Sequence, residues 1–202
     1  MDKVKVWDLP TRVGHWSLVI AFTVAWLSGD SEHWRLVHVV AGYVMAGVLV
    51  FRIFWGLAGS RHARFSSFLF SPRDAAAYLK GLLKGEGRHW VGHNPAGSYA
   101  IYGLILLGFS VILSGWAAYA EVGPEELDDV HEVLVNVMLG LVGLHVTGAI
   151  ASSLLHRENL IRGMVTGYKR GHPEEAIPGM RAAWLLLLFG CMIAAGWYGF
   201  VS

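Results

Sequence analysis

Four histidines lie in segments that are otherwise almost free of polar side chains: His15, His38, His131 and His145. An ionisable residue inside an apolar segment is costly and is a functional hypothesis by default. His131 and His145 are 14 residues apart, which places both rings on one face of a helix, about 21 Å apart along its axis. That distance covers most of a hydrocarbon thickness of about 30 Å. The spacing therefore predicts one imidazole near each membrane surface.

The framework that positions these imidazoles must itself be apolar, and the composition indicates an integral membrane protein. Of the 202 residues, 54% are hydrophobic and only 15% are charged, with a mean hydropathy of +0.47. Soluble domains carry about 25% charged residues. We therefore expect residues 1–202 to form a single all-α transmembrane domain embedded in a lipid bilayer.

The chain has a single cysteine, Cys191, which limits the kinds of cysteine-dependent site that it can form. It excludes an intrachain disulfide, a cysteine-ligated zinc or iron–sulfur site and the C-x-x-C-H signature of c-type haem. The sequence also lacks the glycine-rich patterns of nucleotide-binding loops, and we expect no nucleic-acid partner.

Five stretches are near the roughly 20 residues that a membrane-spanning helix needs. They are residues 11–29, 34–57, 97–119, 130–153 and 182–201. The first has no small-residue cleavage site after it, so we expect a retained helix and not a signal peptide. We find no sheet pattern.

The loop charges predict the orientation. Almost all of the 16 Lys and Arg residues precede the first stretch or lie between the second and third or the fourth and fifth, and only Arg35 borders an opposite loop. The positive-inside rule then places the N-terminus in the cytoplasm and the C-terminus in the periplasm of a bacterial inner membrane. Ser71 and Pro72 predict the start of a short helix on the cytoplasmic surface, and residues 154–171 are a second basic amphipathic candidate.

This orientation makes the depths of the histidines comparable. His15 and His145 lie toward the cytoplasm, and His38 and His131 lie toward the outside. Two neutral imidazoles that face each other inside a helix bundle can bind a haem iron from both sides. The depths therefore predict an inner haem iron held by His15 and His145 and an outer haem iron held by His38 and His131.

Two other interpretations of the histidines stay open. Asp129 and Glu132 beside His131 could complete an outer zinc site. A single membrane histidine also often does no more than hydrogen-bond a neighbouring helix.

Arg52 is a second kind of ionisable residue inside an apolar segment. It follows His38 by 14 residues and so lies at the depth of the inner histidine pair. A propionate of the inner haem would supply the anion that a buried arginine needs, but the side chain could instead snorkel to the cytoplasmic headgroups. His93 and Asn94 are weaker candidates for a quinone or propionate contact. The alternative for them is a turn that starts a helix at Pro95.

Several motifs together resemble the prokaryotic cytochrome b561 family, which includes the b-type cytochrome subunits of nickel–iron hydrogenases. They are VWDLPTRVGHW at 6–16, FRIFWGLAGSRHARFSSF at 51–68, GHNPAGS at 92–98 and LHVTGAIASSLLHRENLIRGMVTG at 144–167. The resemblance covers about residues 5–170. It implies a four-helix core that binds two b haems by bis-histidine ligation, with quinone as a redox partner and with ligands at His15, His38, His131 and His145. The helix at 182–201 lies beyond this core and offers no ligand.

The function expected from this resemblance is electron transfer across the membrane between the quinone pool and a periplasmic redox partner, such as a cytochrome c or an oxidoreductase subunit. The outer loops are acidic and so favour a basic partner; their residues are Asp30, Glu32, Glu121, Glu125, Glu126, Asp128 and Asp129. One alternative is a superoxide:quinone oxidoreductase that works alone. Another is a metal or proton transporter with a histidine relay. A homodimer is a further expected assembly.

Overall fold

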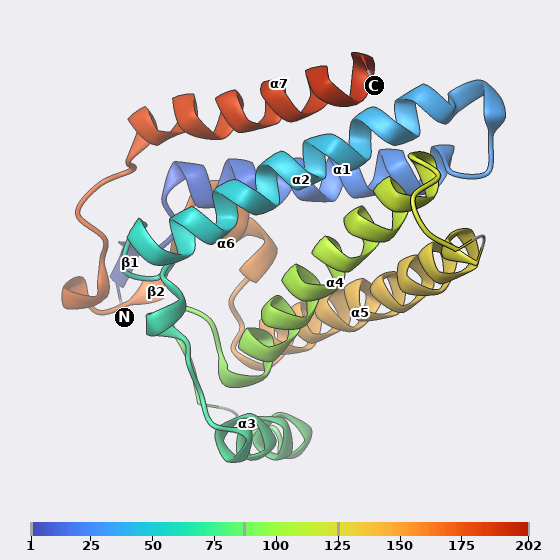
Figure 1. Ribbon diagram of the computed structural model, residues 1–202. Helices are drawn as coiled ribbons and strands as arrows, with labels where there is room; N and C mark the ends of the chain where they lie inside the picture. Colours follow the sequence, from blue (N-terminus) through green and yellow to red (C-terminus); the bar gives the residue numbers. More distant parts are fainter. Residues whose placement is uncertain (1, 87, 125, 202) are drawn as a thin grey trace.

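The structure is a computed structural model that describes residues 2–86, 88–124 and 126–201. Most of the chain is helical (Figure 1). The helices are α1 (Leu9–Ser28), α2 (Arg35–Ala58), α3 (Pro72–Lys84), α4 (Pro95–Tyr119), α5 (Leu127–Leu155), α6 (Leu160–Thr166) and α7 (Leu185–Val201). The five predicted stretches correspond to α1, α2, α4, α5 and α7.

Four helical segments are long and apolar enough to cross a membrane: Glu32–Ala58, Pro95–Tyr119, Leu127–Leu155 and Ala182–Val201. Helix α1 has a spanning length of 20 residues but is not one of the four. Its first two turns contain Pro10, Arg12 and His15, which lower its hydropathy. The expectation of five spans is thus met for four, and the crossing of α1 stays a prediction.

Helices α1, α2, α4 and α5 meet in one apolar cluster. Its buried members come from each of the four helices in turn: Ala21, Met45, Val111 and Met138. Met138 lies seven residues from His131 and seven from His145, so the cluster sits midway between two levels about 10 Å above and below it. An apolar layer therefore separates the two histidine levels.

Helix α7 packs outside this bundle, along α2 (Figure 1). Leu188 is completely buried in a second cluster with Val48, Phe51 and Trp55 of α2. The backbones approach closely, since a Cβ at Gly47 would lie 2.5 Å from the carbonyl oxygen of Cys191. Small residues at a helix interface permit such contact.

A small antiparallel sheet corrects the expectation of a chain without strands. Strand β1 (Asp2–Lys5) pairs with β2 (Tyr168–Gly171), with Lys3 opposite Arg170. Strands of four residues are too short for alternation to reveal them. The residues that follow β1, Val6 and Trp7, are buried, so this sheet closes one end of the bundle.

The stretch 154–171 is not one amphipathic helix. Helix α5 ends at Leu155, α6 is only seven residues long, and β2 follows. Arg157 and Gly167 adopt positive φ angles of 49° and 87°, which interrupt right-handed helix. This segment turns back beneath the bundle to reach β1.

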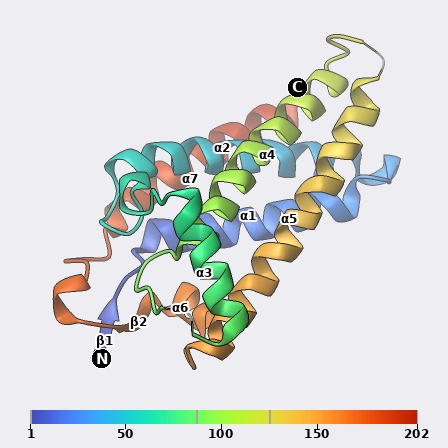
Figure 2. The same ribbon diagram turned by 90° about the horizontal axis from the view of Figure 1, so that it is seen from below.

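Helix α3 begins as predicted and crosses in front of the long helices when the molecule is seen from below (Figure 2), where it contacts α4 and α5. Ser71 caps it by accepting a hydrogen bond from the amide of Asp74, whose side chain accepts one in return from the Ser71 amide. The helix ends at Gly85 with φ +74°. Tyr78 and Ser152 hydrogen-bond at 3.0 Å and join α3 to α5.

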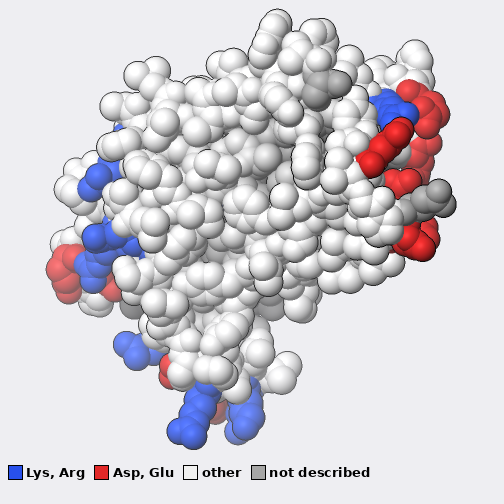
Figure 3. Space-filling view, viewed as in Figure 1, with Lys and Arg blue, Asp and Glu red and all other residues white. Residues whose placement is uncertain are grey.

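Figure 3 shows most Lys and Arg side chains toward one end of the bundle, beside a few Asp and Glu, and mainly Asp and Glu at the other end. We call the end with β1, β2, α3 and α6 the basic end, and the end with the α1–α2 and α4–α5 loops the acidic end. The N-terminal strand lies at the basic end and the last residues of α7 lie at the acidic end. Glu125 of the acidic loops lies outside the described residues.

Candidate haem-binding site

The acidic-end pair consists of His38 from α2 and His131 from α5. Their ring centroids lie 6.2 Å apart with an angle of 86° between the ring planes. A metal–imidazole bond is about 2 Å long, so two rings on opposite sides of one ion have centroids roughly 6 Å apart. The spacing of this pair therefore fits a single iron between the two rings.

Both rings of the acidic-end pair are held through Nδ1. That atom of His38 lies 2.8 Å from the carbonyl oxygen of Ala25, and that of His131 lies 3.0 Å from the carbonyl oxygen of Val111. Because a carbonyl only accepts, each Nδ1 carries the proton and Nε2 keeps its lone pair. This is the arrangement that orients a histidine for metal binding.

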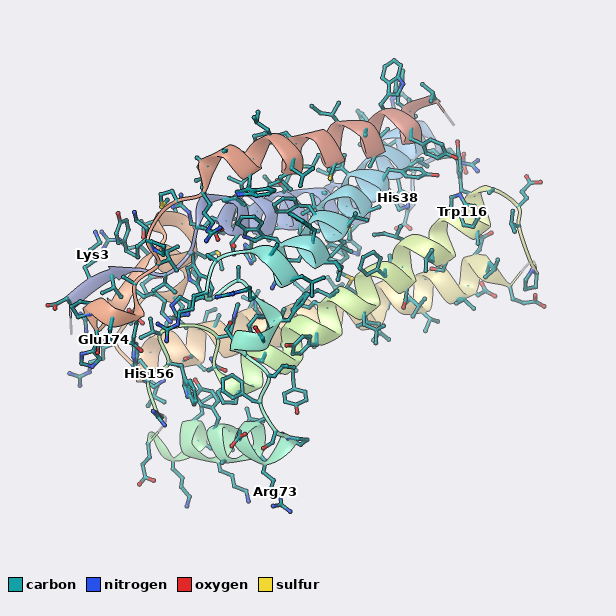
Figure 4. The ribbon with its side chains drawn as sticks, turned by 60° about the vertical axis from the view of Figure 1, so that its left-hand side comes forward. Lys3, His38, Arg73, Trp116, His156 and Glu174 are labelled. Atoms are coloured by element: carbon teal, nitrogen blue, oxygen red, sulfur yellow. The ribbon has the colours of Figure 1, made fainter. Side chains whose placement is uncertain are left out.

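Gly115 leaves room for the ring of His131. A Cβ at this position would lie 2.7 Å from Cε1 of His131, too close for the ring to stay in place, whereas a Cβ on Gly29 would make an ordinary contact of 3.6 Å with His38. Ser114 Oγ also lies 3.1 Å from Nδ1 of His131. The end of α4 therefore forms a close seat for the second ring. Figure 4 shows Trp116, from the same turn of α4, at the end of the bundle where His38 lies.

The basic-end pair consists of His15 from α1 and His145 from α5. The two side chains interact electrostatically, and the His15 ring packs edge-on against Trp16 with centroids 5.3 Å apart. Nδ1 of His15 and Nε1 of Trp16 are buried without a hydrogen-bond partner among the described residues. A buried polar atom left unpaired in a native protein calls for a missing partner.

Arg52 adds a third unpaired nitrogen at this level. Its guanidinium lies over the ring of Phe65 at 4.7 Å, and its Nη1 is buried with no partner in the described part of the chain. Asp8 interacts with Arg52 electrostatically but accepts its own hydrogen bonds from Thr11 and Trp55. The unpaired nitrogens of His15, Trp16 and Arg52 therefore fit a bound cofactor that contains an iron ion and has carboxylates at its edge.

His93 and Asn94 have separate roles. The Asn94 side chain accepts the Gly97 amide at 2.7 Å and caps α4 ahead of Pro95, which confirms the helix start. His93 packs against Trp7 and Phe68, with ring centroids 4.7 and 4.4 Å away. Burial, followed by the nearby Arg52 and other cationic groups, holds the pKa of His93 well below its ordinary value.

The outer zinc interpretation finds no support in the described residues. No group of three or more His, Cys, Asp or Glu side chains among them could hold a metal ion. Asp129 and Glu132 are exposed, so they do not complete a ligand set with His131. Two imidazoles alone leave a zinc ion short of its usual four ligands.

Sequence reasoning did not find Trp16, Ser114 or Gly115. Trp16 follows a candidate ligand directly, which was a usable clue. Ser114 and Gly115 lie near the outer end of the stretch 97–119, at the depth of His38 and His131. The stretch 97–119 contains no candidate ligand, so two small residues at the depth of a ligand pair were the indication that a ring packs against it.

Comparison with known proteins relates the chain to b-type cytochromes. The family model described as prokaryotic cytochrome b561 matches residues 6–167. Among curated proteins, the chain is 24% identical over 212 residues to a "Probable Ni/Fe-hydrogenase B-type cytochrome subunit" of Rhodobacter capsulatus, covering 82% of this chain and 81% of that one. A Cupriavidus necator protein of the same name is 25% identical, with 81% and 86% covered. No solved structure matches.

Proposed function

Because the chain belongs to the prokaryotic cytochrome b561 family, we propose that it is a dihaem b-type cytochrome that carries electrons between the quinone pool and a periplasmic redox partner. Family membership makes it a membrane-embedded b-type cytochrome of an electron-transfer class. The observation that carries the finer proposal is the acidic-end pair, whose rings are 6.2 Å apart and whose Nδ1 atoms are both occupied.

The residues assigned to each haem follow from the two levels. His38 and His131 bind the outer haem iron, and His15 and His145 bind the inner one. Arg52 pairs with an inner propionate. Haem b supplies one-electron chemistry at each level, and the apolar cluster around Met138 excludes water between the levels. Two oriented imidazoles, His38 and His131, and the buried, unpaired Nδ1 of His15 are difficult to explain without such a group.

The charge distribution supports an orientation. The basic end carries most Lys and Arg residues and the acidic end carries Asp30, Glu32, Glu126 and Asp128 (Figure 3). The positive-inside rule places the basic end in the cytoplasm. The first helix, α1, runs beside α2 through the full bundle (Figure 1), and we assign it as the fifth span.

The partner at the outer surface follows from the same charges. An acidic face attracts a basic protein and repels anions such as superoxide. Among the residues that the structure describes at this end, Arg35 is the only Lys or Arg, and it lies 3.8 Å from Glu32. The partner class that we assign to this face is a basic electron-transfer protein, either a cytochrome c or, because the curated relatives are named as hydrogenase subunits, an electron-donating hydrogenase-type subunit.

Haem content tests the proposal directly. A pyridine haemochrome spectrum of the full chain, purified in detergent, should give two b haems per chain. His131→Ala should lose the outer haem and His145→Ala the inner one, whereas the exposed His33→Ala should keep both. Retention of both haems with an unchanged spectrum in the first two variants would overturn the assignment. A chain without haem, expressed with adequate haem supply, would favour a transporter.

The docking face needs a separate experiment. Electron exchange with a basic cytochrome c should slow as ionic strength rises, because exposed charges are screened beyond about 10 Å at 0.1 M salt. Replacing Asp30 and Glu32 by Asn and Gln should reduce this salt dependence. The matched control is Glu174→Gln at the basic end. A salt dependence that does not change in the acidic-face variant would exclude this face as the docking site.

A further inference from the structure

A group of buried ionisable side chains at the basic end takes no part in the haem site. Glu158 and Lys169 are only 8% and 7% exposed. One carboxylate oxygen of Glu158 lies 3.0 Å from Nε2 of His89 and 3.8 Å from Nζ of Lys169. The other accepts the backbone N–H of Arg170. Lys169 also donates to the carbonyl oxygen of Trp90 at 2.9 Å.

This group continues inward toward the basic-end pair. His93 interacts electrostatically with Lys169 and also with Arg52 and His145. Glu158 and Lys169 are thus in contact, and His93 couples Lys169 to the residues at the level of His145. All three come from segments between the long helices, where the backbone is free to bring them together.

The Glu158 side of this group is open to water. A cavity of about 300 Å³ lies beside Glu158 and is also lined by Ser153, Arg157 and Asn159. The ring of His156 packs edge-on against His89, with centroids 5.5 Å apart. Figure 4 shows His156 at the basic end, on the same side as Glu174 and Lys3. Protons from the aqueous phase thus have access to Glu158 and His89.

A purely structural ion pair does not explain the choice of lysine. A fixed, buried partner for a carboxylate is usually an arginine, because its planar group stays charged and binds with two donors. Burial lowers the pKa of Lys169 to about 8, although Glu158 and Glu175 oppose this shift. A lysine in this range exchanges its proton near neutral pH, whereas an arginine does not.

We propose that Glu158 and Lys169 form a proton-uptake route from the basic-end surface to quinone bound at the level of His145. The inference rests on the proposed function. Reduction of quinone to quinol consumes two electrons, supplied through the haems by the periplasmic donor, and two protons, and it forms an O–H bond at each carbonyl oxygen. Lys169 releases a proton inward and regains one from water through Glu158 and His89.

Several charged or titratable groups face Lys169 and share its titration. They come from the loop after α2, the loop before α4, the loop after α5 and the turn after β2. These groups are His62, His93, His156, Glu158 and Glu175. The pH response therefore has to be assigned with variants at Lys169 itself.

The test follows electron transfer from the full-length, haem-loaded protein to a short-chain ubiquinone analogue. The haems are first reduced with dithionite, the excess is removed, and their oxidation is recorded after rapid mixing. Lys169→Arg retains the charge but removes the exchangeable proton, and Glu158→Gln retains the hydrogen-bonding shape. We expect both variants to be at least about tenfold slower, since general acid catalysis contributes at least that much. The exposed Lys3→Arg and Glu174→Gln are the matched controls.

A pH profile separates proton delivery from a structural role. A donor must be protonated, so the wild-type rate should fall as pH rises through about 8, and Lys169→Arg should lose that fall. Haem content and reduction potentials should stay unchanged in both variants.

Four outcomes are decisive. Slow variants beside normal controls support the route. Rates equal to wild type overturn it while the proposed function stands. Slow variants that have also lost haem overturn it in favour of a structural role. A haem-loaded wild-type chain that passes no electrons to quinone overturns both the proposed function and the route.

Discussion

Gly115 of α4 lies directly against the imidazole of His131, so close that an added Cβ would stand 2.7 Å from Cε1 of the ring. The ring cannot retreat freely, because its Nδ1 is held by the carbonyl oxygen of Val111 at 3.0 Å. We therefore expect Gly115→Ala to displace His131 and to weaken or abolish binding of the outer haem. Haem per chain, from a pyridine haemochrome spectrum, should fall from two toward one.

The matched control for this change is Gly140→Ala on α5. No atom lies within 4 Å of a Cβ at Gly140, and alanine favours a helix over glycine by roughly 1 kcal/mol. This variant should keep both haems. If Gly115→Ala also keeps both, with unchanged low-spin features, the close seat for His131 has no role in haem binding.

The approach of His38 to His131 could be predicted from the sequence because helix geometry is nearly constant. A spacing of 14 residues separates His131 and His145 on α5 by a fixed rise, and His38 lies 6.2 Å from His131 between ring centroids. Ser71 and Asn94 were identifiable as caps since a cap depends on local residues alone. The seat at Gly115 was not predictable in this way, because it depends on how closely α4 approaches α5.

The basic end was the least predictable part. Strand β1 has only four residues, and its partner β2 lies more than 160 residues later. The break after α5 depends on the positive φ angle of Arg157, a conformation that is uncommon for a residue with a side chain. The convergence of Glu158, Lys169 and His93 follows from these turns and so requires the tertiary structure.

Acid should loosen the start of α3. Hydrogen bonds from the Ser71 hydroxyl and amide lower the pKa of Asp74. A carboxyl group with a lower pKa in the folded state contributes stability above its unfolded pKa, and this contribution is lost as pH falls through the folded pKa. Hydrogen-exchange protection of the first turn of α3 should therefore decrease from pH 7 to pH 3. Asp74→Asn should have weaker protection at pH 7 and a smaller change with pH.

The control for this prediction is another exposed carboxylate that does not cap a helix. Asp2 is also exposed and acidic but caps no helix. Asp2→Asn should leave the protection of α3 and its pH dependence as in wild type. Equal pH dependence in Asp74→Asn and wild type would show that the capping box does not determine the acid response.

Asp8 should be important for stability at the basic end. Its side chain is completely buried, caps α1 through the Thr11 amide at 2.8 Å and accepts the indole N–H of Trp55 at 3.1 Å. Asp8→Ala removes a helix cap worth about 1 kcal/mol and leaves the indole N–H of Trp55 with only the Thr11 hydroxyl, 3.2 Å away, as an acceptor among the described residues. We expect a lower midpoint of thermal unfolding in detergent, by several degrees.

Asp8→Asn distinguishes the hydrogen bonds from the charge. An asparagine oxygen can still accept from Thr11 or Trp55, so this variant should recover a large part of the lost stability. A midpoint as low as that of Asp8→Ala would show that the negative charge, which also interacts with Arg52, is the greater contribution.

Arg52 should raise the reduction potential of the inner haem. Its Nη1 is buried and has no hydrogen-bond partner within the described residues, and a nearby cation favours the reduced form, which carries one less positive charge. Arg52→Leu should lower the inner potential by on the order of 60 mV, which corresponds to a tenfold change in a one-electron equilibrium. A redox titration of the visible spectrum resolves the two haems, and the outer potential should not move. Arg64→Leu, at an exposed position in the loop after α2, is the control. An inner potential that stays constant in Arg52→Leu would instead support the interpretation that this side chain snorkels to the headgroups.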